Sequence, residues 1–208
     1  MNADAIIFDM DGTLWDSSDV VAESWNNVIN ACPDVKEPIS ADRIKSVMGK
    51  HLFVIAEELF PQLEQEKRLG LIKSCCEQEN ILLTEKGGKL FEGLEDTLRD
   101  LKQKSNLYIV SNCQSGYIEA FFAHHKLDRY FSDYQCAGAS SKTKGENLID
   151  LIERNNIKSA YYVGDTQIDY DATRKACIPF VYAAYGFGQV QGYEYRIDAI
   201  TDLADMFN

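Results

Sequence analysis

Apolar runs and amphipathic stretches alternate along the chain in a regular order. Residues 5–8 (AIIF) form a short apolar run with the length of a buried strand. From residue 17 to residue 85 the apolar positions follow helical spacing, with a break at residues 32–38. After KGGK at residues 86–89, short β-rich runs alternate with amphipathic stretches of about ten residues. This order is typical of a parallel sheet with helical connections, preceded by a helical segment.

The pattern also places the individual elements. Ser17 or Ser18 is expected to cap the first helix, and Ser40 a second one that Gly49 closes. Further helices are predicted at 51–60, 63–80, 94–104, 115–127, 145–156 and 168–177. Strands are predicted at 5–8, 106–112, 134–138, 159–165 and 178–183.

Residues 5–8 have no strand partner close in sequence, so we expect them to join the later sheet across the helical segment. The predicted fold class is therefore α/β, a doubly wound parallel sheet with an inserted α-helical cap domain. We expect residues 1–15 and 86–208 to form the core and residues 16–85 to form the cap.

Composition and charge narrow the classes of function. The 208 residues are 45% hydrophobic and carry a formal net charge of −12, which argues against a partner that is a nucleic-acid polymer. No apolar run approaches a membrane span, and the N-terminus lacks a basic leader. The six cysteines show no C-x-x-C spacing, so we expect reduced thiols and a cytoplasmic protein. We also expect a monomer or a homodimer.

The stretch DMDGT sets Asp9 and Asp11 on either side of one residue directly after the first strand. Residues i and i+2 of an extended segment point the same way, and Gly12 lets the chain turn away. Two like charges so close need a cation or a reaction to justify them. A carboxylate can attack phosphorus while a second one moves the proton of the leaving oxygen. The alternatives are an acidic turn and a calcium loop, and the position of Gly12 rejects the calcium loop.

Three later stretches carry chemistry that fits the first. Ser111 ends a predicted strand, where its hydroxyl can bind a phosphoryl oxygen. Lys144 stands directly before a helix and can neutralise a transferring phosphoryl group, with Lys142 as the alternative. Asp165 ends another predicted strand, and Asp169 lies four residues further on. Carboxylates from two strands, that of Asp165 among them, can hold Mg²⁺ together.

All four stretches lie at the carboxyl ends of predicted parallel strands, where such sheets bind ligands. A nucleophile pair, a hydroxyl, a cation and a metal carboxylate are the parts that phosphoryl transfer requires. The motifs, in this order, resemble those of the haloacid dehalogenase superfamily, in its phosphatase branch with a helical cap after the first strand. DMDGT resembles the D-x-D-G-T motif, and GDTQID resembles the G-D-x-x-x-D motif.

The resemblance implies a role for each position. Asp9 is the implied nucleophile and Asp11 the implied general acid and base. The Asp9 carboxylate, the Asp11 backbone carbonyl and Asp165 are the implied Mg²⁺ ligands. An acid at position 11 favours phosphate-ester hydrolysis or phosphomutase chemistry over dehalogenation.

The same resemblance implies a phosphate-binding set. Ser111 and Lys144 are expected to hold the phosphoryl group, with Thr13 and a backbone donor of Asn112 beside it. Asp169 is expected to orient the lysine or the metal shell.

The cap is expected to choose the substrate. Lys50 and His51 stand at a break between helices and are the predicted contacts to the end of the substrate far from phosphate. The aromatics Trp25, Phe53, Phe60 and Phe91 are expected to pack the cap.

Three functions stay open. The first is an Mg²⁺-dependent phosphatase of a small phosphorylated metabolite, with 2-phosphoglycolate the foremost named substrate. The second is a phosphomutase of the β-phosphoglucomutase type. The third is a non-catalytic phosphoryl-binding module, which would not need Asp11.

Overall fold

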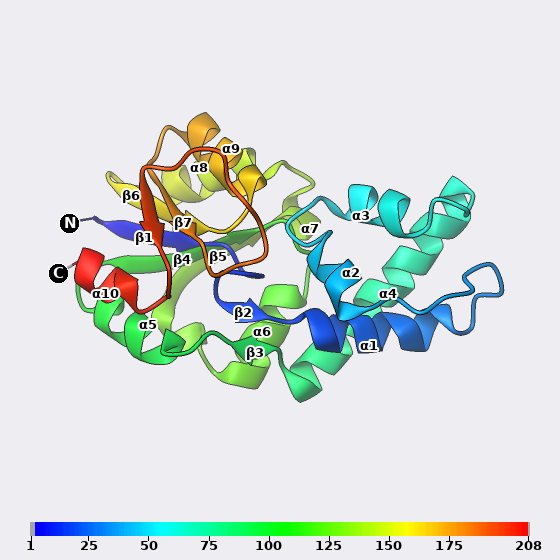
Figure 1. Cartoon of the computed structure of the whole chain (residues 1–208). Helices are drawn as coiled ribbons and strands as arrows, with labels where there is room; N and C mark the ends of the chain where they lie inside the picture. The colour runs from blue at the N-terminus through cyan, green and yellow to red at the C-terminus, as the bar shows by residue number, and fades with distance from the viewer. Residues whose placement is uncertain (1–2, 208) are drawn as a thin grey trace.

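A six-stranded parallel sheet forms the centre of the molecule, which we describe from a computed structural model covering residues 3–207. Its strand order is β5-β4-β1-β6-β7-β8, so the first strand of the chain lies between two that follow much later (Figure 1). The strands are β1 (Ala5–Phe8), β4 (Asn106–Ser111), β5 (Phe131–Cys136), β6 (Ala160–Gly164), β7 (Phe180–Ala183) and β8 (Tyr195–Ile197). This arrangement confirms the predicted α/β class.

Strand β1 is buried on both faces, which explains its unbroken apolar sequence. Because side chains alternate along a strand, Ile6 and Phe8 pack into one hydrophobic cluster while Ala5 and Ile7 pack into another. Two separate apolar layers therefore hold the strand that carries Asp9 at its end.

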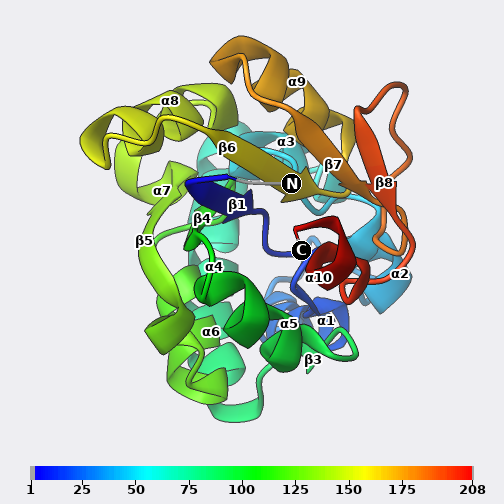
Figure 2. The same ribbon diagram turned by 90° about the vertical axis from the view of Figure 1, so that its left-hand side faces the viewer.

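Helices cover both faces of the sheet. Figure 2 shows α8 and α9 on one side and α5, α6 and α10 on the other. These helices are α5 (Leu94–Lys102), α6 (Tyr117–His125), α8 (Lys144–Arg154), α9 (Gln167–Ala176) and α10 (Asp202–Met206). Short helical turns lie beside β5, namely η1 (Asp128–Tyr130) and α7 (Ala137–Ser140).

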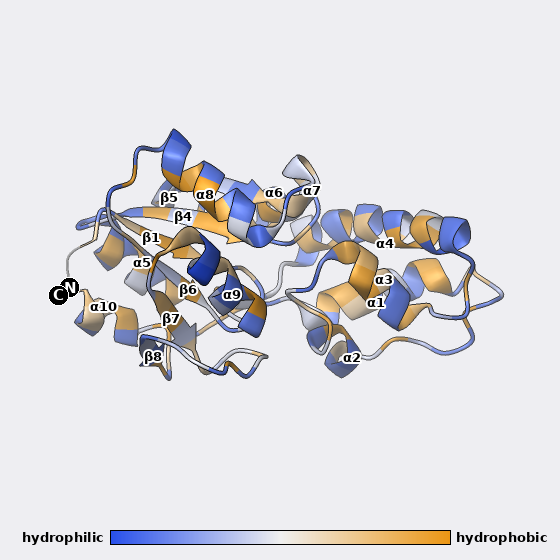
Figure 3. Ribbon diagram, turned by 90° about the horizontal axis from the view of Figure 1, so that it is seen from above, coloured by the Kyte–Doolittle hydropathy of each residue, from blue (hydrophilic) through white to orange (hydrophobic). Residues whose placement is uncertain are grey.

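A second, all-helical lobe is inserted between β1 and β4, as Figures 1 and 3 show. It holds α1 (Ser18–Ile29), α2 (Ala41–Lys45), α3 (Leu52–Leu59) and α4 (Gln65–Lys86). Where it joins the core, β2 (Trp15–Asp16) and β3 (Lys89–Leu90) pair as an antiparallel ribbon. Both chain crossings between the lobes run through this ribbon, next to the boundaries predicted for the cap domain.

Several element bounds differ from the predicted ones. Helix α4 continues six residues past the predicted end at residue 80, because four of residues 81–86 are Leu, Glu or Lys, which favour helix. Gly87, at φ +68°, ends the helix. Strand β5 begins at Phe131, earlier than predicted, and the ribbon β2–β3 and strand β8 were not predicted.

The expectation that the cap aromatics are packed is correct for Phe60, which is fully buried, and wrong for Phe53, which is 58% exposed. The cysteines are unpaired, and Cys75, Cys76 and Cys136 are buried. Among the described residues, no helix has the length and apolar character needed to cross a membrane.

Candidate active site

Asp9 stands directly after β1 and is almost completely buried. Its backbone N–H donates to the carbonyl of Val163 at 2.9 Å, which extends the pairing of β1 with β6 to the site itself. Gly12 turns the chain away at φ +77°, in the left-handed region that favours glycine. A Cβ at that position would lie 2.3 Å from the Asp165 carboxylate, so glycine lets the two strand ends approach.

Lys144 is a buried cation between two carboxylates. Its Nζ lies 2.7 Å from Asp9 Oδ1 and also pairs with Asp169 Oδ1. Burial disfavours its charge, but Asp169 and Asp9 together raise its pKa above the ordinary value. The side chain starts at the first residue of α8, whose N-terminus Thr143 and Glu146 hold in a reciprocal capping box.

Lys142 does not reach this site. Its ammonium pairs with Asp150 at 2.5 Å, and its side chain is 49% exposed. Of the two lysines left open by the sequence, the structure brings Lys144 to Asp9.

Asp165 directly follows β6, and its carboxylate lies near that of Asp9 at the edge of the sheet. Its Oδ2 accepts hydrogen bonds from the backbone N–H groups of Phe187 at 2.7 Å and Gly188 at 3.3 Å. Its Oδ1 is buried and has no hydrogen-bond partner within residues 3–207. Burial, followed by the charges of Asp169 and Asp9, raises the pKa of Asp165 well above its usual range. Its unpartnered oxygen is available to bind a cation.

The carboxylates of Asp9, Asp165 and Asp169 each offer one oxygen within 4.8 Å of the others. Asp169 is already occupied, because its two oxygens accept from Lys144, Tyr162 and the Thr166 backbone and hydroxyl. The oxygens left for an ion are those of Asp9 and Asp165. Such an all-oxygen donor set fits a hard divalent cation such as Mg²⁺.

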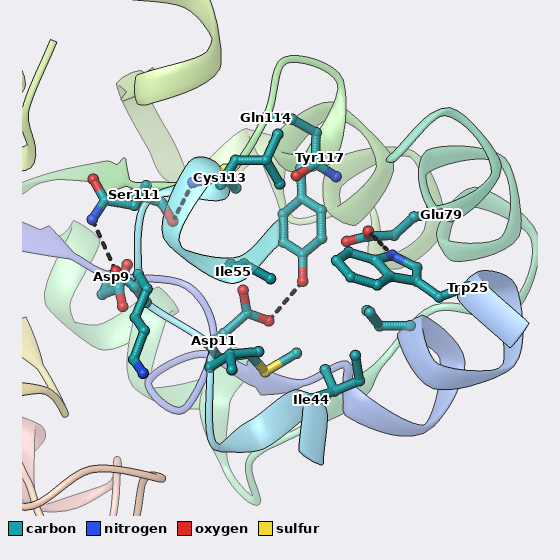
Figure 4. A pocket seen from close by; sticks show the side chains of 17 residues that line it. Asp9, Asp11, Trp25, Ile44, Ile55, Glu79, Ser111, Cys113, Gln114 and Tyr117 are labelled. Atoms are coloured by element: carbon teal, nitrogen blue, oxygen red, sulfur yellow. Dashed lines mark hydrogen bonds between the residues drawn. The ribbon is translucent and has the colours of Figure 1, made fainter. Parts of the chain in front are cut away.

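Asp11 has a different environment from Asp9. Its Oδ1 accepts hydrogen bonds from Ser17 Oγ and from the Tyr117 hydroxyl, both at 2.7 Å. Figure 4 shows the contact with Tyr117. Burial raises the pKa of Asp11 to about 6, and these two hydrogen bonds moderate the rise. A carboxyl held in place with a pKa near neutrality is suited to proton transfer.

The remaining predicted phosphate contacts lie around the same point. Ser111 ends β4, is buried and lines the cavity in front of Asp9. Asn112 lines it too, but its side-chain amide donates to the Gly49 carbonyl at 2.8 Å and so joins core to cap. Thr13 is fully buried, and its hydroxyl has no hydrogen-bond partner in the described part of the chain.

The cap closes over this point and leaves a cavity of about 60 Å³ that both lobes line. Asp9, Asp11 and Ser111 line it from the core. The cap contributes a mainly apolar wall that includes Val21, Trp25, Ile44, Val47, Leu52 and Ile55.

The two predicted cap contacts differ in their placement. Lys50 lines the cavity, but its ammonium is held by both carboxylate oxygens of Glu58, at 2.7 and 2.9 Å. His51 stacks on Phe53 and lines a separate hollow, so the structure does not bring it to the Asp9 cavity.

Sequence reasoning missed several residues of the cavity, four of which bear on its chemistry. Glu79, Gln114 and Tyr117 were not singled out, and Trp25 was assigned to packing alone. Figure 4 shows Tyr117 pointing at Asp11 and the Trp25 indole N–H pointing at Glu79. The available signal was Glu79 itself, an acid flanked by apolar positions on the buried face of α4.

Comparison with known proteins gives consistent results. Residues 6–183 match the model of a family described as haloacid dehalogenase-like hydrolase. The chain is 31% identical over 192 residues to phosphoglycolate phosphatase of Synechococcus elongatus, covering 90% of this chain and 86% of that protein. It is 25% identical to phosphoglycolate phosphatase of Agrobacterium fabrum, over 94% of this chain and 87% of the relative.

Solved structures show the same fold. A haloacid dehalogenase-like hydrolase from Streptococcus pneumoniae superimposes with a TM-score of 0.85 at 20% identity, over 99% of each chain. CbbY from Rhodobacter sphaeroides, solved with xylulose-1,5-bisphosphate, superimposes with a TM-score of 0.79 at 15% identity, over 97% of this chain and 96% of that one.

Proposed function

The chain belongs to the haloacid dehalogenase-like hydrolase family and is a phosphatase, and on this premise we propose that it hydrolyses small phosphomonoesters through a phosphorylated Asp9. The observation that carries the proposal is the different environment of the two aspartates. Asp9 is buried against Lys144, whereas Asp11 is hydrogen-bonded through a single oxygen by Ser17 and Tyr117. One acid is placed to react, and the other is placed to move a proton.

The reaction follows from these positions. A carboxylate oxygen of Asp9 attacks phosphorus, and the bond between phosphorus and the ester oxygen breaks. Protonated Asp11 gives its proton to the leaving alkoxide. In the second step Asp11 takes a proton from water, whose oxygen attacks the aspartyl-phosphate and releases phosphate and free Asp9. Lys144 compensates the negative charge at Asp9 throughout, and Asp169 holds its ammonium in place.

A divalent cation completes the proposed site. The Asp9 and Asp165 carboxylates, with the Asp11 backbone carbonyl, would hold Mg²⁺. Asp169 would orient Lys144 through its ion pair with the Lys144 ammonium. The unpartnered Asp165 oxygen and the raised pKa of this acid support the assignment, because both indicate a buried carboxylate without its counter-ion. The ion would polarise the phosphoryl oxygens.

The names of the curated relatives support 2-phosphoglycolate as the first substrate to assay. Ser111, Thr13 and the backbone N–H of Asn112 are the proposed contacts to the phosphoryl group.

The test is phosphate release from a panel of esters, with and without Mg²⁺. The panel holds 2-phosphoglycolate, sugar phosphates, nucleotides and phenyl phosphate. Release that depends on Mg²⁺ supports the proposal. Turnover of a sugar 1-phosphate that needs a bisphosphate primer and releases no phosphate would replace it with the phosphomutase alternative.

A further inference from the structure

Glu79 is a carboxyl group on the cap that lines the catalytic cavity opposite the reacting aspartates. It lies on α4 and is only 4% exposed. Its Oε2 accepts a hydrogen bond of 2.5 Å from the Trp25 indole, a contact drawn in Figure 4. The chemistry proposed above does not use this residue. A buried acid that lines a substrate cavity and takes no part in the proposed chemistry is a candidate contact to the substrate.

The charges that line the cavity favour one kind of ligand. Three carboxyl groups line it, those of Asp9, Asp11 and Glu79. The one cationic side chain among the described residues that line it is Lys50, and Glu58 holds that ammonium with both oxygens. A substrate carboxylate bound beside Glu79 would therefore have no free cationic side chain of the cavity lining to pair with.

The dimensions and the walls of the cavity point to a small leaving group. The cavity of about 60 Å³ is small, which favours a leaving group of few heavy atoms. Most of the cap wall is apolar, so Glu79 and Gln114 are the polar groups available far from the phosphoryl end. Burial also raises the pKa of Glu79 to about 8, so the group is a neutral acid near pH 7 and ionises only where a cationic donor pairs with it.

We propose that Glu79 is a specificity-determining residue, and that it selects phosphomonoesters of a small alcohol that presents an amine or hydroxyl donor and no carboxylate. The inference rests on the proposed phosphatase function. It adds that this cap disfavours 2-phosphoglycolate, although the curated relatives are named for that substrate. Glu79 accepts a hydrogen bond from the amine or hydroxyl of the leaving group, and the hydrogen bond from the Trp25 indole holds the Glu79 carboxyl in place.

The experiment compares four esters: ethanolamine phosphate, glycerol 3-phosphate, 2-phosphoglycolate and phenyl phosphate. Values of kcat and KM are measured with Mg²⁺ for the wild type, Glu79→Gln and Glu79→Leu. Glu77→Gln is the matched control, because Glu77 is exposed on the same helix. Thermal melts of each variant show whether it is folded.

The inference predicts that the wild type prefers an amine- or hydroxyl-bearing ester to 2-phosphoglycolate by about tenfold or more in kcat/KM. Glu79→Leu lowers the ratio of kcat/KM for that ester to kcat/KM for phenyl phosphate by about tenfold, mainly through KM. If the donor is an amine, Glu79→Gln has the same effect; if it is a hydroxyl, the amide retains most of the preference. Glu77→Gln leaves every ratio unchanged.

Two results overturn the inference while the phosphatase function stands. One is a wild type that prefers 2-phosphoglycolate, and the other is a Glu79→Leu variant that slows all four esters in parallel. Release from none of the four esters, phenyl phosphate included, would instead overturn the proposed function, and the inference with it.

Discussion

Lys144 shows how a single buried residue makes a cluster of acids tolerable. Its ammonium lies between Asp9 and Asp169, and all three side chains are at most 2% exposed. Each carboxylate alone would be costly to bury, so the fold and the reaction depend on the same cation.

Removing this cation should cost both stability and activity. We expect Lys144→Met to lower the free energy of unfolding by about 3–5 kcal/mol and the rate by about 100-fold or more. Lys142→Met is the control, and its half-exposed ion pair predicts a change within about 0.5 kcal/mol. Urea unfolding and phosphate release measure both effects. A Lys142→Met variant that loses activity while Lys144→Met retains it would reverse the assignment of the phosphate-binding lysine.

Glu79 makes stability depend on pH in a defined direction. Burial holds the pKa of this acid at about 8 in the fold, against 4.5 for the free side chain, while the hydrogen bonds from Trp25 and Gln114 lower it and the charge of Asp11 raises it. Between these values the unfolded chain has lost the proton and the folded chain keeps it, so the contribution of Glu79 to stability falls as pH rises. The slope is about 1.4 kcal/mol for each pH step.

Glu79→Gln should remove this dependence. Urea unfolding at pH 5 to 8 is expected to show the variant gaining stability relative to the wild type as pH rises. Parallel curves for the two proteins would show that Glu79 is already ionised in the fold.

At the scale of elements, the turn after β1 decides where the acids stand. Gly12 at φ +77° passes so close to Asp165 that no side chain fits. The predicted turn at Gly12 therefore also leaves room for the Asp165 carboxylate beside the end of β1.

Gly12→Ala tests this role. The left-handed backbone costs about 1–2 kcal/mol for a residue with a Cβ, and the displaced Asp165 should lower the rate by about 100-fold. Gly70→Ala is the matched control, since nothing lies within 4 Å of a Cβ at that exposed helical position. It should leave activity unchanged and raise stability by up to about 1 kcal/mol. Equal activity of both variants would contradict the role given to Gly12.

The core elements were predictable because their signals are local. The apolar run of β1 and the alternation after residue 86 describe the sheet, and the acids at strand ends locate the site. The ribbon β2–β3 was not predictable, because each strand has two residues and the pairing joins segments more than seventy positions apart.

The contacts of Glu79, Trp25 and Tyr117 around the cavity could not be predicted from local sequence patterns either. Glu79 and Trp25 lie 54 positions apart and meet only when α1 packs on α4. Tyr117 reaches Asp11 from α6, 106 positions away. Contacts of this kind follow from the packing of helices, which no periodicity encodes.

At the scale of the whole molecule, metal binding should be visible as stability. An ion that binds only the folded chain adds about 2.7 kcal/mol at one hundred times its dissociation constant, which corresponds to a rise in Tm of about 5 °C or more. We expect this rise with Mg²⁺ and its loss on chelation. Asp165→Asn should abolish it without lowering the Tm of the metal-free protein, since burial already disfavours the charged form of this acid and the amide keeps its size. The same rise in Asp165→Asn would exclude Asp165 as a ligand.

The central claim is that Asp9 carries the phosphoryl group during turnover. The most direct measurement is acid quenching of the enzyme during hydrolysis of its preferred ester, followed by mass spectrometry of the peptide that contains residues 5–17. We predict that this peptide gains the mass of one phosphoryl group on Asp9, and that Asp9→Asn neither gains it nor releases phosphate while its melting curve stays that of a folded protein. Rapid phosphate release with no modified peptide, or turnover by Asp9→Asn, would contradict the account.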